Sequence, residues 1–249
     1  MSLQGRIAVI TGAARGIGRQ IAEQLAADGA DTVAIDLTEA TETIAAVEEH
    51  GRRGLAIVAD VTSSAALAAA AERVRQELGN ASIVVNNAGI HPHQTSFDEV
   101  DEALWTRSLR INLDSVFLVS KAFVGQLRAS GNGRIVNMSS SVANVAPLGG
   151  VHYVTAKSGV AGLTRALARE LGSDGITVNA IAPSIVQTPG LAETALPQDV
   201  VNAVLAQQII PEFTTPADIV GLVSYLCTPA ARFLTGQHLH LDGGIVFGD

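Results

Sequence analysis

The chain has 249 residues, of which 47% are hydrophobic and 16% charged, and its formal net charge is −8. This length and composition predict one α/β domain over residues 1–249 with a large core, and they exclude a disordered chain. An acidic chain without a block of basic residues lacks the phosphate-neutralising surface of a nucleic-acid-binding protein.

The cysteine content and the apolar runs bear on whether the protein is exported, inserted in a membrane or kept in the cytoplasm. The single cysteine, Cys227, excludes an internal disulfide and fits a reducing environment. The first residues run into a strand-like segment without the basic head and cleavage site of an export signal. A long uncharged run, residues 175–192, is interrupted by Asn179, Pro183 and Pro189. We therefore expect a cytoplasmic protein that makes no membrane contact.

Strand-like apolar runs alternate with segments of helical periodicity along the whole chain. The predicted strands are Ile7–Thr11, Thr32–Asp36, Leu55–Asp60, Ile83–Asn86, Arg134–Ser139, Thr177–Ala182 and His238–Leu241. The predicted helices are Gly18–Gly29, Ala40–His50, Ser64–Leu78, Asp101–Ala129, Tyr153–Gly172 and Pro216–Leu226. Near-continuous Val/Ile runs between amphipathic helices predict a doubly wound, Rossmann-type α/β fold, with a parallel sheet of about seven strands and helices on both faces.

A glycine-rich turn, TGAARGIG, follows the first predicted strand. Gly12, Gly16 and Gly18 permit a tight turn and let backbone N–H groups approach a pyrophosphate at the helix N-terminus. The spacing G-x-x-x-G-x-G differs from the dinucleotide fingerprint G-x-G-x-x-G, so the prediction also depends on the strand–loop–helix context. We expect a dinucleotide site here, with Arg15 and Ile17 of the same loop among its contacts.

The second predicted strand ends in AIDLT, which bears on the choice of dinucleotide. Asp36 can accept hydrogen bonds from the adenosine ribose hydroxyls, and its charge repels a 2′-phosphate, so Asp36 and the adjoining Leu37 favour NAD(H). A turn or helix-capping aspartate is the structural alternative. Arg15 favours NADP(H), because a cation in the loop attracts the 2′-phosphate. We give Asp36 more weight, since a residue at the strand end addresses the ribose hydroxyl directly.

The third and fourth strands end in two further cofactor motifs, ADVT and VNNAG. The first can hold the adenine edge and face. In the second, the asparagines can tie the loop backbone together and the glycine leaves room for the cofactor, although asparagines in a strand-end turn also occur for structural reasons alone. The predicted contacts are Asp60, Val61, Asn87, Ala88 and Gly89.

Tyr153 and Lys157 form a Tyr-x-x-x-Lys pair in a chain with only two tyrosines and two lysines. At this spacing on a helix both side chains lie on one face, so the ammonium can lie near the phenol. That arrangement favours the phenolate and predicts a tyrosine pKa below its usual value of about 10. An ordinary surface pair is the alternative from these residues alone.

Together these motifs resemble the short-chain dehydrogenase/reductase family. The resemblance covers nearly the whole chain and rests on TGAARGIG, NNAG, INLDSVF, SSSVANVAPLGGVHYVTAK, GITVNAIAP and TGQHLHLDGG. It implies an enzyme that acts on the CH–OH group of donors with NAD(P) as acceptor, by hydride transfer between nicotinamide C4 and a carbinol carbon. The segments NNAGIHPHQTSFDEV and IAPSIVQT resemble, more weakly, the branch of the family that oxidises aryl secondary alcohols such as 1-phenylethanol.

Matched by position, the resemblance implies a catalytic set of Asn112, Ser140, Tyr153 and Lys157. Tyr153 would be the general acid or base on the substrate oxygen, with its pKa lowered by Lys157 and by the nicotinamide charge. Ser140 would hydrogen-bond the developing alkoxide. Lys157 would also hold the nicotinamide ribose, and Asn112 a water for proton relay. Serines flank Ser140 on both sides, so its choice rests on the spacing to Tyr153.

One departure from the family pattern follows the sixth predicted strand. The family usually has Pro-Gly, whereas this chain has IAPSIVQT, with Ser184 in place of the glycine. Pro183, Val186 and Thr188 still match the positions that hold the nicotinamide amide. A side chain at Ser184 is expected to protrude into the floor of the substrate pocket, either as a substrate contact or as a tolerated neighbour.

Three histidines are further candidates for the substrate pocket. His91 and His93 follow the NNAG turn, and His152 immediately precedes Tyr153. An H-x-H pair can bind a metal, but no carboxylate or cysteine ligand pattern accompanies this one. We therefore expect histidines at the pocket rim and no metal site.

The sequence leaves three functions open. We expect NAD(H)-dependent interconversion of a small, neutral secondary alcohol and its ketone. The alternatives are NADPH-dependent reduction of 3-oxoacyl chains on an acyl carrier protein and a non-catalytic dinucleotide-binding regulator. The substrate lid expected at about residues 188–213 is apolar and acidic, and there is no Lys or Arg from Glu170 through Ala231, which disfavours an acidic carrier protein.

An oligomer is also expected. The segments Asp101–Ala129 and Tyr153–Gly172 carry more apolar surface than one face of a sheet needs. Members of the family that this chain resembles pair through those helices. The sequence therefore predicts a homotetramer, or at least a dimer.

Overall fold

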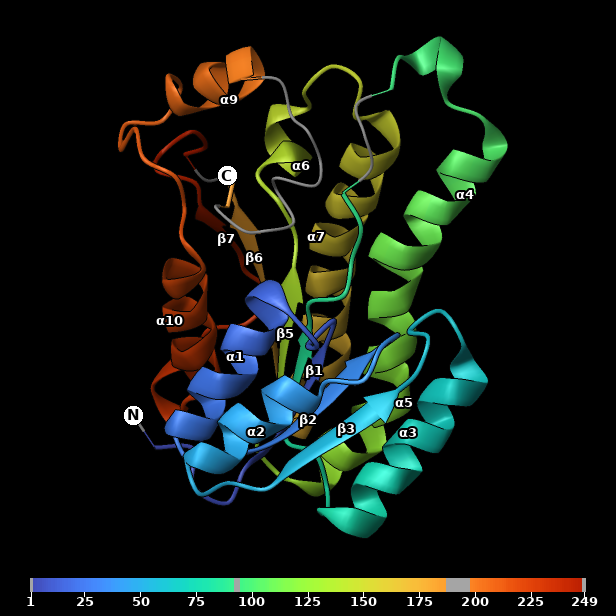
Figure 1. The fold of residues 1–249 in the computed structure, drawn as a ribbon, viewed down its shortest axis with the longest axis vertical. Helices are drawn as coiled ribbons and strands as arrows, with labels where there is room; N and C mark the ends of the chain where they lie inside the picture. The colour runs from blue at the N-terminus through green and yellow to red at the C-terminus, as the bar shows by residue number, and fades with distance from the viewer. Residues whose placement is uncertain (1, 92–94, 187–197, 248–249) are drawn as a thin grey trace.

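The computed structural model describes residues 2–91, 95–186 and 198–247. Within them one parallel sheet contains β1 (Ile7–Thr11), β2 (Asp31–Asp36), β3 (Gly54–Val58), β4 (Ile83–Asn86), β5 (Arg134–Met138), β6 (Thr177–Pro183) and β7 (His238–Leu241). The strand order is β3-β2-β1-β4-β5-β6-β7, and every neighbouring pair is parallel (Figure 1). The predicted doubly wound fold is confirmed.

Helices connect the strands and cover the sheet on both faces. They are α1 (Gly16–Ala27), α2 (Thr41–Glu49), α3 (Ser64–Glu77), α4 (Glu102–Leu109), α5 (Ser115–Ala129), α6 (Val142–Val145), α7 (Val151–Leu171), α9 (Gln198–Leu205) and α10 (Pro216–Cys227). Among the described residues, no helix is long and apolar enough to cross a membrane.

Alternate residues of each strand face opposite layers of helices. In β1, Ala8 and Ile10 belong to the apolar cluster that includes α1 and α10, whereas Ile7 and Val9 belong to the cluster of α3, α5 and α7. Figure 1 shows α1 and α10 side by side on their layer. Because both faces are buried, the strands read as continuous apolar runs rather than as an alternating pattern.

The predicted helix Asp101–Ala129 is divided in the structure. The side chain of Asp101 caps α4 by accepting a hydrogen bond from the N–H of Leu104 at 2.7 Å. A π-helical segment of 5 residues, Arg110–Asp114, then separates α4 from α5. Such segments often mark functional sites, and this one carries Asn112. The apolar periodicity predicted the helical region correctly but could not show the change of winding within it.

Two helices were not predicted from the sequence. The helix α6 has 4 residues and ends at Ala146, whose φ of 48° is left-handed. A single turn is too short to show a helical period. The helix α9 lies within the expected lid; residues 188–197 of that lid fall outside the described residues.

The strand order reverses direction between β1 and β4, so the carboxyl ends of these two strands form the topological switch point of the sheet. Ligands of doubly wound sheets bind at this switch point. The glycine-rich turn follows β1, and the VNNAG motif follows β4, so both predicted cofactor motifs meet there.

Candidate active site

The glycine-rich turn has a conformation that only glycine adopts without strain. Gly12 and Gly16 have φ values of 65° and 62°, in the left-handed region. A Cβ atom at Gly18 would lie 2.1 Å from the carbonyl oxygen of Gly12, whereas one at Gly16 would meet no atom within 4 Å. The turn therefore closes tightly on itself and leaves open space at the N-terminus of α1, where a pyrophosphate fits.

The turn after β4 is fastened to the glycine-rich turn. The Nδ2 atom of Asn87 donates to the carbonyl oxygens of Thr11 and Gly12 at 2.9 and 3.1 Å. The backbone N–H groups of Asn87 and Ala88 donate to Thr11 Oγ1 at 3.1 and 3.0 Å. Asn87 thus ties loop backbone together as the sequence predicts. Asn86 does not, because its Nδ2 points into the protein toward Ser120 and Asn137.

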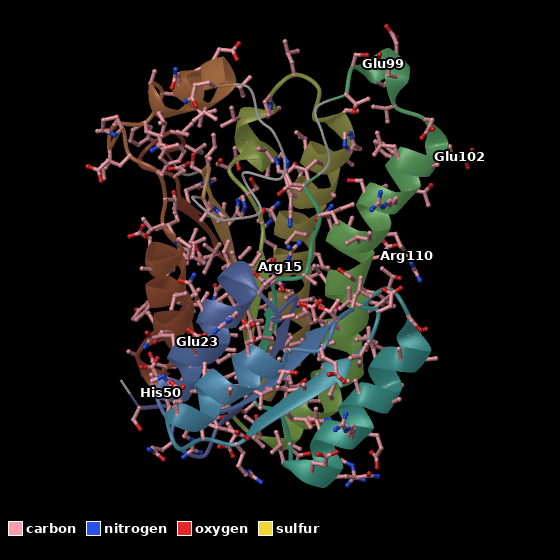
Figure 2. The ribbon with its side chains drawn as sticks, viewed as in Figure 1. Arg15, Glu23, His50, Glu99, Glu102 and Arg110 are labelled. Atoms are coloured by element: carbon pink, nitrogen blue, oxygen red, sulfur yellow. The ribbon has the colours of Figure 1, made fainter. Side chains whose placement is uncertain are left out.

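Asp36 ends β2 beside the glycine-rich turn. Its Oδ2 accepts a hydrogen bond from the N–H of Ala14 at 2.9 Å, and its Oδ1 accepts one from Leu37 at 2.7 Å. The carboxylate of Asp36 therefore also stabilises a turn, which was the alternative role considered for it in the sequence. A carboxylate has about four lone-pair sites, so acceptor capacity remains for a ligand. Leu37 is 69% exposed, and Arg15 lies exposed at the start of α1 (Figure 2).

The predicted adenine contacts lie after β3. Asp60 is exposed, and its Oδ1 accepts hydrogen bonds from the N–H and the hydroxyl of Thr62, both at 2.8 Å. Val61 is buried in the apolar cluster of the α3 layer. Both residues follow the carboxyl end of the sheet, at the same edge as Asp36.

Tyr153, Lys157 and Ser140 come together at the carboxyl ends of β5 and β6. Tyr153 and Lys157 lie one turn apart in α7, and Lys157 Nζ is 5.6 Å from the centroid of the Tyr153 ring. The ammonium donates to the carbonyl oxygen of Met138 at 2.9 Å. A side-chain hydrogen bond joins Ser140 to Tyr153. The i, i+4 spacing thus puts both side chains on one face, where Lys157 is buried and Tyr153 half-buried, and not on an exposed surface.

The structure separates the three consecutive serines. Ser139 is buried; its Oγ donates to the carbonyl oxygen of Lys157 at 3.1 Å and lies 2.9 Å from His238 Nε2. Ser141 is also buried, and its backbone N–H donates to Pro183 O at 2.9 Å. Ser140 is half-buried and hydrogen-bonded to Tyr153. The geometry agrees with the choice of Ser140, which was made from its spacing to Tyr153.

The predicted direction of the Tyr153 pKa is wrong for the polypeptide alone. Burial raises the pKa of Tyr153 to about 12, and the hydrogen bond with Ser140 acts in the opposite direction. Burial also lowers the pKa of Lys157 to about 8. The cause is that desolvation disfavours both charged forms, and the ammonium is directed at Met138 rather than at the phenol oxygen.

Asn112 lies in the π-helical segment beneath the turn after β4. Its Oδ1 accepts from the N–H of Ile90 at 3.1 Å, and its Nδ2 donates to Ser108 O at 3.1 Å. A Cβ atom at Gly89 would lie 2.9 Å from Asn112 Oδ1 and 3.7 Å from Lys157 Nζ. Gly89 thus allows the loop, the asparagine and the lysine to approach closely. The water relay implied for Asn112 stays a prediction.

Of the predicted pocket histidines, His91 lies beside the tyrosine. The rings of His91 and Tyr153 are 4.8 Å apart between centroids and meet at 61°, edge to face. His152 is fully buried, burial lowers its pKa, and within the described residues neither ring nitrogen has a hydrogen-bond partner. It therefore lies inside the protein and not at the surface of the substrate pocket, where a substrate contact was expected. His93 and Thr188 lie outside the described residues.

Ser184 does not direct its hydroxyl as the sequence suggested. It follows Pro183, the last residue of β6, and its Oγ donates to Gln208 Oε1 at 2.9 Å. The expected protrusion into the pocket floor is corrected to a bond with the segment after α9. Val186 forms an isolated parallel bridge with Thr214. Nothing in the sequence pointed to Gln208, because the two partners are 24 positions apart.

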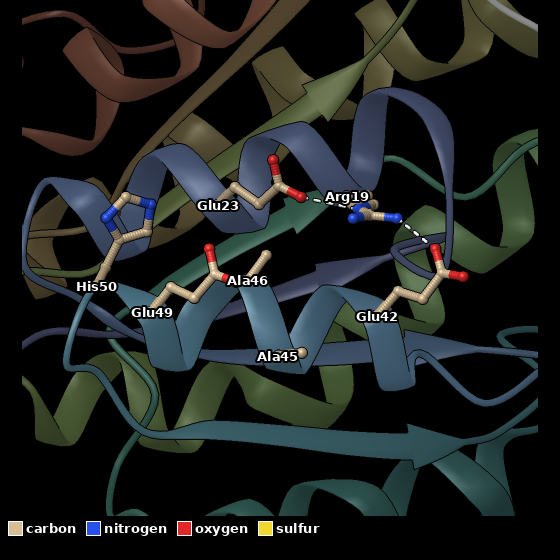
Figure 3. A pocket seen from close by; sticks show the side chains of 7 residues that line it. All are labelled: Arg19, Glu23, Glu42, Ala45, Ala46, Glu49 and His50. Carbon is tan, nitrogen blue, oxygen red and sulfur yellow. Dashed lines mark hydrogen bonds and ion pairs between the residues drawn. The ribbon is translucent and has the colours of Figure 1, made fainter.

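A surface groove between α1 and α2 lies apart from these residues. Figure 3 shows Arg19 in ion pairs with Glu23 and Glu42, at 2.7 and 2.6 Å. None of the predicted cofactor or catalytic residues lines it. Over residues 2–91, 95–186 and 198–247, no group of three or more His, Cys, Asp or Glu side chains could hold a metal ion.

Comparisons with known proteins support the family resemblance seen in the sequence. A family model described as enoyl-(acyl carrier protein) reductase matches residues 12–246. The chain is similar to the cis-4-hydroxycyclohexanecarboxylate dehydrogenase of Sinomonas cyclohexanicum, with 38% identity over 96% of this chain and 96% of that protein. It is similar to the 3-oxoacyl-(acyl-carrier-protein) reductase FabG of Escherichia coli K12, with 36% identity over 98% of this chain and 99% of that protein.

A solved structure also matches over nearly the full length. The carveol dehydrogenase of Mycobacterium avium in complex with NAD superposes with a TM-score of 0.90, at 32% identity, covering 98% of both chains. The fold, the position of the glycine-rich turn and the dehydrogenase relatives agree with the resemblance seen in the sequence motifs. This chain belongs to the short-chain dehydrogenase/reductase family and is an oxidoreductase acting on CH–OH groups with NAD or NADP.

Proposed function

We propose that the chain, acting as one dinucleotide-binding domain, interconverts a small secondary alcohol and its ketone with NAD(H), and that Tyr153 is the general acid/base. The observation that carries the proposal is the Ser140–Tyr153 hydrogen bond, with Lys157 one helical turn further on. An acid/base group must reach the substrate oxygen, and a second donor must stabilise charge that develops there. Tyr153 supplies the acid/base group and Ser140 the second donor, and the two hydroxyls are hydrogen-bonded to each other.

Each residue of the set has a separate task in this proposal. In alcohol oxidation Tyr153 takes the hydroxyl proton while the carbinol hydrogen leaves as hydride, and Ser140 donates to the same oxygen. A bound nicotinamide would accept the hydride. Lys157 would hold the nicotinamide ribose, and Asn112 positions the turn after β4 through Ile90. Burial raises the pKa of Tyr153 to about 12 in the polypeptide alone, so a positive charge near the phenol would be needed to lower it.

We propose NAD(H) rather than NADP(H) as the cofactor. The carboxylate of Asp36 lies beside the glycine-rich turn, 2.9 Å from the N–H of Ala14, where it would accept from a ribose hydroxyl and repel a 2′-phosphate. The solved carveol dehydrogenase contains NAD. The residues proposed to hold the cofactor are Gly12, Arg15, Gly16, Ile17, Gly18, Asp36, Leu37, Asp60, Val61, Asn87, Ala88, Gly89, Tyr153, Lys157, Pro183, Val186 and Thr188.

We propose a neutral, mostly apolar substrate. The described part of the lid exposes Ile209 and Ile210, at 68% and 60%, and no Lys or Arg occurs from Glu170 through Ala231. An acidic carrier protein is attracted by basic residues, which this segment lacks. The names of two relatives specify cis-4-hydroxycyclohexanecarboxylate, which is an anion, and carveol, which is neutral; both are cyclic secondary alcohols. Ring-bearing secondary alcohols are therefore the first compounds to test.

A second function is supported by the comparisons. The FabG reductase of Escherichia coli is nearly as similar as the dehydrogenase of Sinomonas, at 36% against 38% identity. This relation favours NADPH-dependent reduction of a 3-oxoacyl thioester. The acidic and apolar lid argues against it, because it offers no docking cation for the carrier.

One panel of assays separates the two functions. The specificity constant kcat/KM is measured for 1-phenylethanol and acetophenone, for cyclohexanol and cyclohexanone, and for an acetoacetyl thioester, each with NAD(H) and NADP(H). We expect a ring alcohol or ketone with NAD(H) to give the highest value. A preference of tenfold or more for the thioester with NADPH would contradict the proposal and select the reductase function.

We also propose a homotetramer in the cytoplasm. On the outer side of α5, Phe117 is 47% exposed although its neighbour Val116 is buried, which leaves an aromatic ring for a partner to cover. Light scattering at micromolar concentration measures the mass directly, and we expect about four times the 25.7 kDa of one chain. A species of about 26 kDa alone would contradict the proposal.

A further inference from the structure

Ser184 stands where the family pattern has glycine, and its hydroxyl has a definite partner. It donates to Oε1 of Gln208 at 2.9 Å, across 24 positions of sequence. Its backbone N–H donates to Leu241 O, at the end of β7, at 3.2 Å. Ser184 therefore connects three parts of the chain, namely the end of β6, the end of β7 and the segment that follows α9.

Gln208 is built into the protein as a brace. Its side chain is buried, with 7% of the residue exposed. The Nε2 atom donates to the carbonyl oxygens of Ile210 and Glu212 at 2.8 and 2.7 Å, while Oε1 accepts from Ser184. Both amide hydrogens and the oxygen are thus used, which is the condition for burying a polar side chain at low cost.

The turn after β7 is shaped around this brace. The N–H groups of Ile209 and Ile210 donate to the carbonyl oxygen of Gly243 at 2.8 and 3.0 Å. A Cβ atom at Gly243 would lie 2.7 Å from Gln208 Nε2 and 2.8 Å from Ile210 O. Glycine at this position therefore leaves the space that the amide of Gln208 occupies. We call α9 together with residues 206–213 the lid arm.

The Ser184–Gln208 bond is also close to the loop that carries the proposed catalytic serine, Ser140. Pro183, next to Ser184, accepts a hydrogen bond from the N–H of Ser141 at 2.9 Å, and Ser141 adjoins Ser140. A displacement of the lid arm at Gln208 thus reaches the active-site edge of β6 through the Ser184–Gln208 bond, beside the backbone bridge between Val186 and Thr214. A glycine at position 184 would have no such bond.

We propose that Ser184 and Gln208 are a positioning pair that holds the lid arm against the end of β6 and thereby sets the affinity for the alcohol or ketone. The expected effect on KM rests on the proposed function, whereas the expected effect on the position of the lid arm does not. A neutral hydrogen bond contributes about 0.5–1.5 kcal/mol, which corresponds to roughly 2- to 12-fold in a binding constant. The pair acts on substrate binding and does not touch the reacting atoms.

The structural test is amide hydrogen exchange of peptides that cover residues 198–212, measured on the full protein without substrate. Ser184→Ala and Gln208→Ala should both speed exchange of the lid arm, and Ser184→Thr, which keeps the donor, should preserve its protection. The matched control is Gln207→Ala, because the Gln207 side chain is exposed and, among the described residues, its amide donates to Ala203 O of α9. Lid-arm exchange in Ser184→Ala that equals wild type would overturn the proposal.

The kinetic test separates positioning from a general loss of structure. KM for the best ketone of the assay panel should rise about 3- to 10-fold in Ser184→Ala and in Gln208→Ala, with a smaller change in kcat and an unchanged Kd for NADH. The double variant should be no worse than the worse single variant, because both remove one interaction. Additive effects would overturn the pairing. If no alcohol or ketone is turned over by the wild type, the proposed function fails, whereas the exchange test still decides on the pair.

Discussion

The two halves of the sheet position their ligands by different means. On the β1–β2 side, the turn that would hold the dinucleotide is set by glycines, backbone hydrogen bonds and one carboxylate within the first 36 residues, with further bonds from Thr43, Asn87 and Ala88. On the β5–β7 side, side chains come from the loop after β5, from α7, from the π-helical segment and from the lid arm. The first half is local in sequence, and the second is assembled by tertiary contacts.

Because of this difference, the two halves should tolerate amino-acid substitutions differently. In the dinucleotide half the backbone itself makes the site, so a side chain added at a close approach is not accommodated. In the hydride half most neighbours are side chains, and a single substitution removes one function while leaving the fold intact. Substitutions in the two halves should therefore fail in different ways, and the four predictions below test that contrast.

The largest effect is expected in the hydride half, at Tyr153. Tyr153→Phe removes the proton donor and acceptor but keeps the ring that contacts His91. We expect kcat to fall at least ~10²-fold, the usual scale for a general acid–base group, while fluorescence titration still shows NADH binding. Tyr225→Phe on α10 is the matched control and should keep its activity. Full activity in Tyr153→Phe would remove this residue from the mechanism.

The next effect concerns the pH dependence of stability. The folded-state pKa of Lys157, about 8, lies below its usual 10.5, so the unfolded chain binds more protons between these values and stability rises with pH there. The Tyr153 shift acts above pH 10, where stability falls. Between pH 8 and 10, denaturant unfolding should show the wild type gaining about 2 kcal/mol relative to Lys157→Met. A constant difference between the two proteins across that window would refute the buried ammonium.

In the dinucleotide half, Gly18→Ala should damage both the fold and cofactor binding. The added Cβ would lie 2.1 Å from Gly12 O, a backbone atom, and overpacking of this kind costs about 2 kcal/mol. Calorimetry should show the loss together with weaker NADH binding. Gly162→Ala in α7 is the control, since its Cβ would meet no atom within 4 Å, and it should gain about 0.5–1 kcal/mol. Equal stability of the two variants would contradict the tight turn.

The smallest effect is expected at Asp36, where the dinucleotide half uses a side chain. Asp36→Ala should lower the ratio of kcat/KM for NADH over NADPH about tenfold, equivalent to about 1.4 kcal/mol, by removing ribose contacts and charge repulsion. Glu39→Ala removes the same charge from an exposed position 3 residues further on and should leave the ratio unchanged. A wild-type enzyme that prefers NADPH would show that Arg15 outweighs Asp36.

What the sequence could predict follows the same division. Gly12 and Gly18 were predictable because sterics within one turn fix their role, and the strands were predictable because burial on both faces leaves continuous apolar runs. The bonds Ser184–Gln208 and Ser139–His238 were not, because their partners lie 24 and 99 positions apart. The i, i+4 spacing predicted that Tyr153 and Lys157 are close, but spacing carries no information on desolvation, which sets the direction of the pKa.

The most direct test of the account is a single-turnover measurement of deuteride transfer. NADH carrying deuterium at both positions of nicotinamide C4 is mixed with excess enzyme and the best ketone of the assay panel, and the alcohol is analysed by mass spectrometry over time. We predict deuterium on the carbinol carbon at a rate that falls at least ~10²-fold in Tyr153→Phe and stays at the wild-type value in Tyr225→Phe. An unlabelled alcohol, or equal rates in the wild type and Tyr153→Phe, would contradict the account.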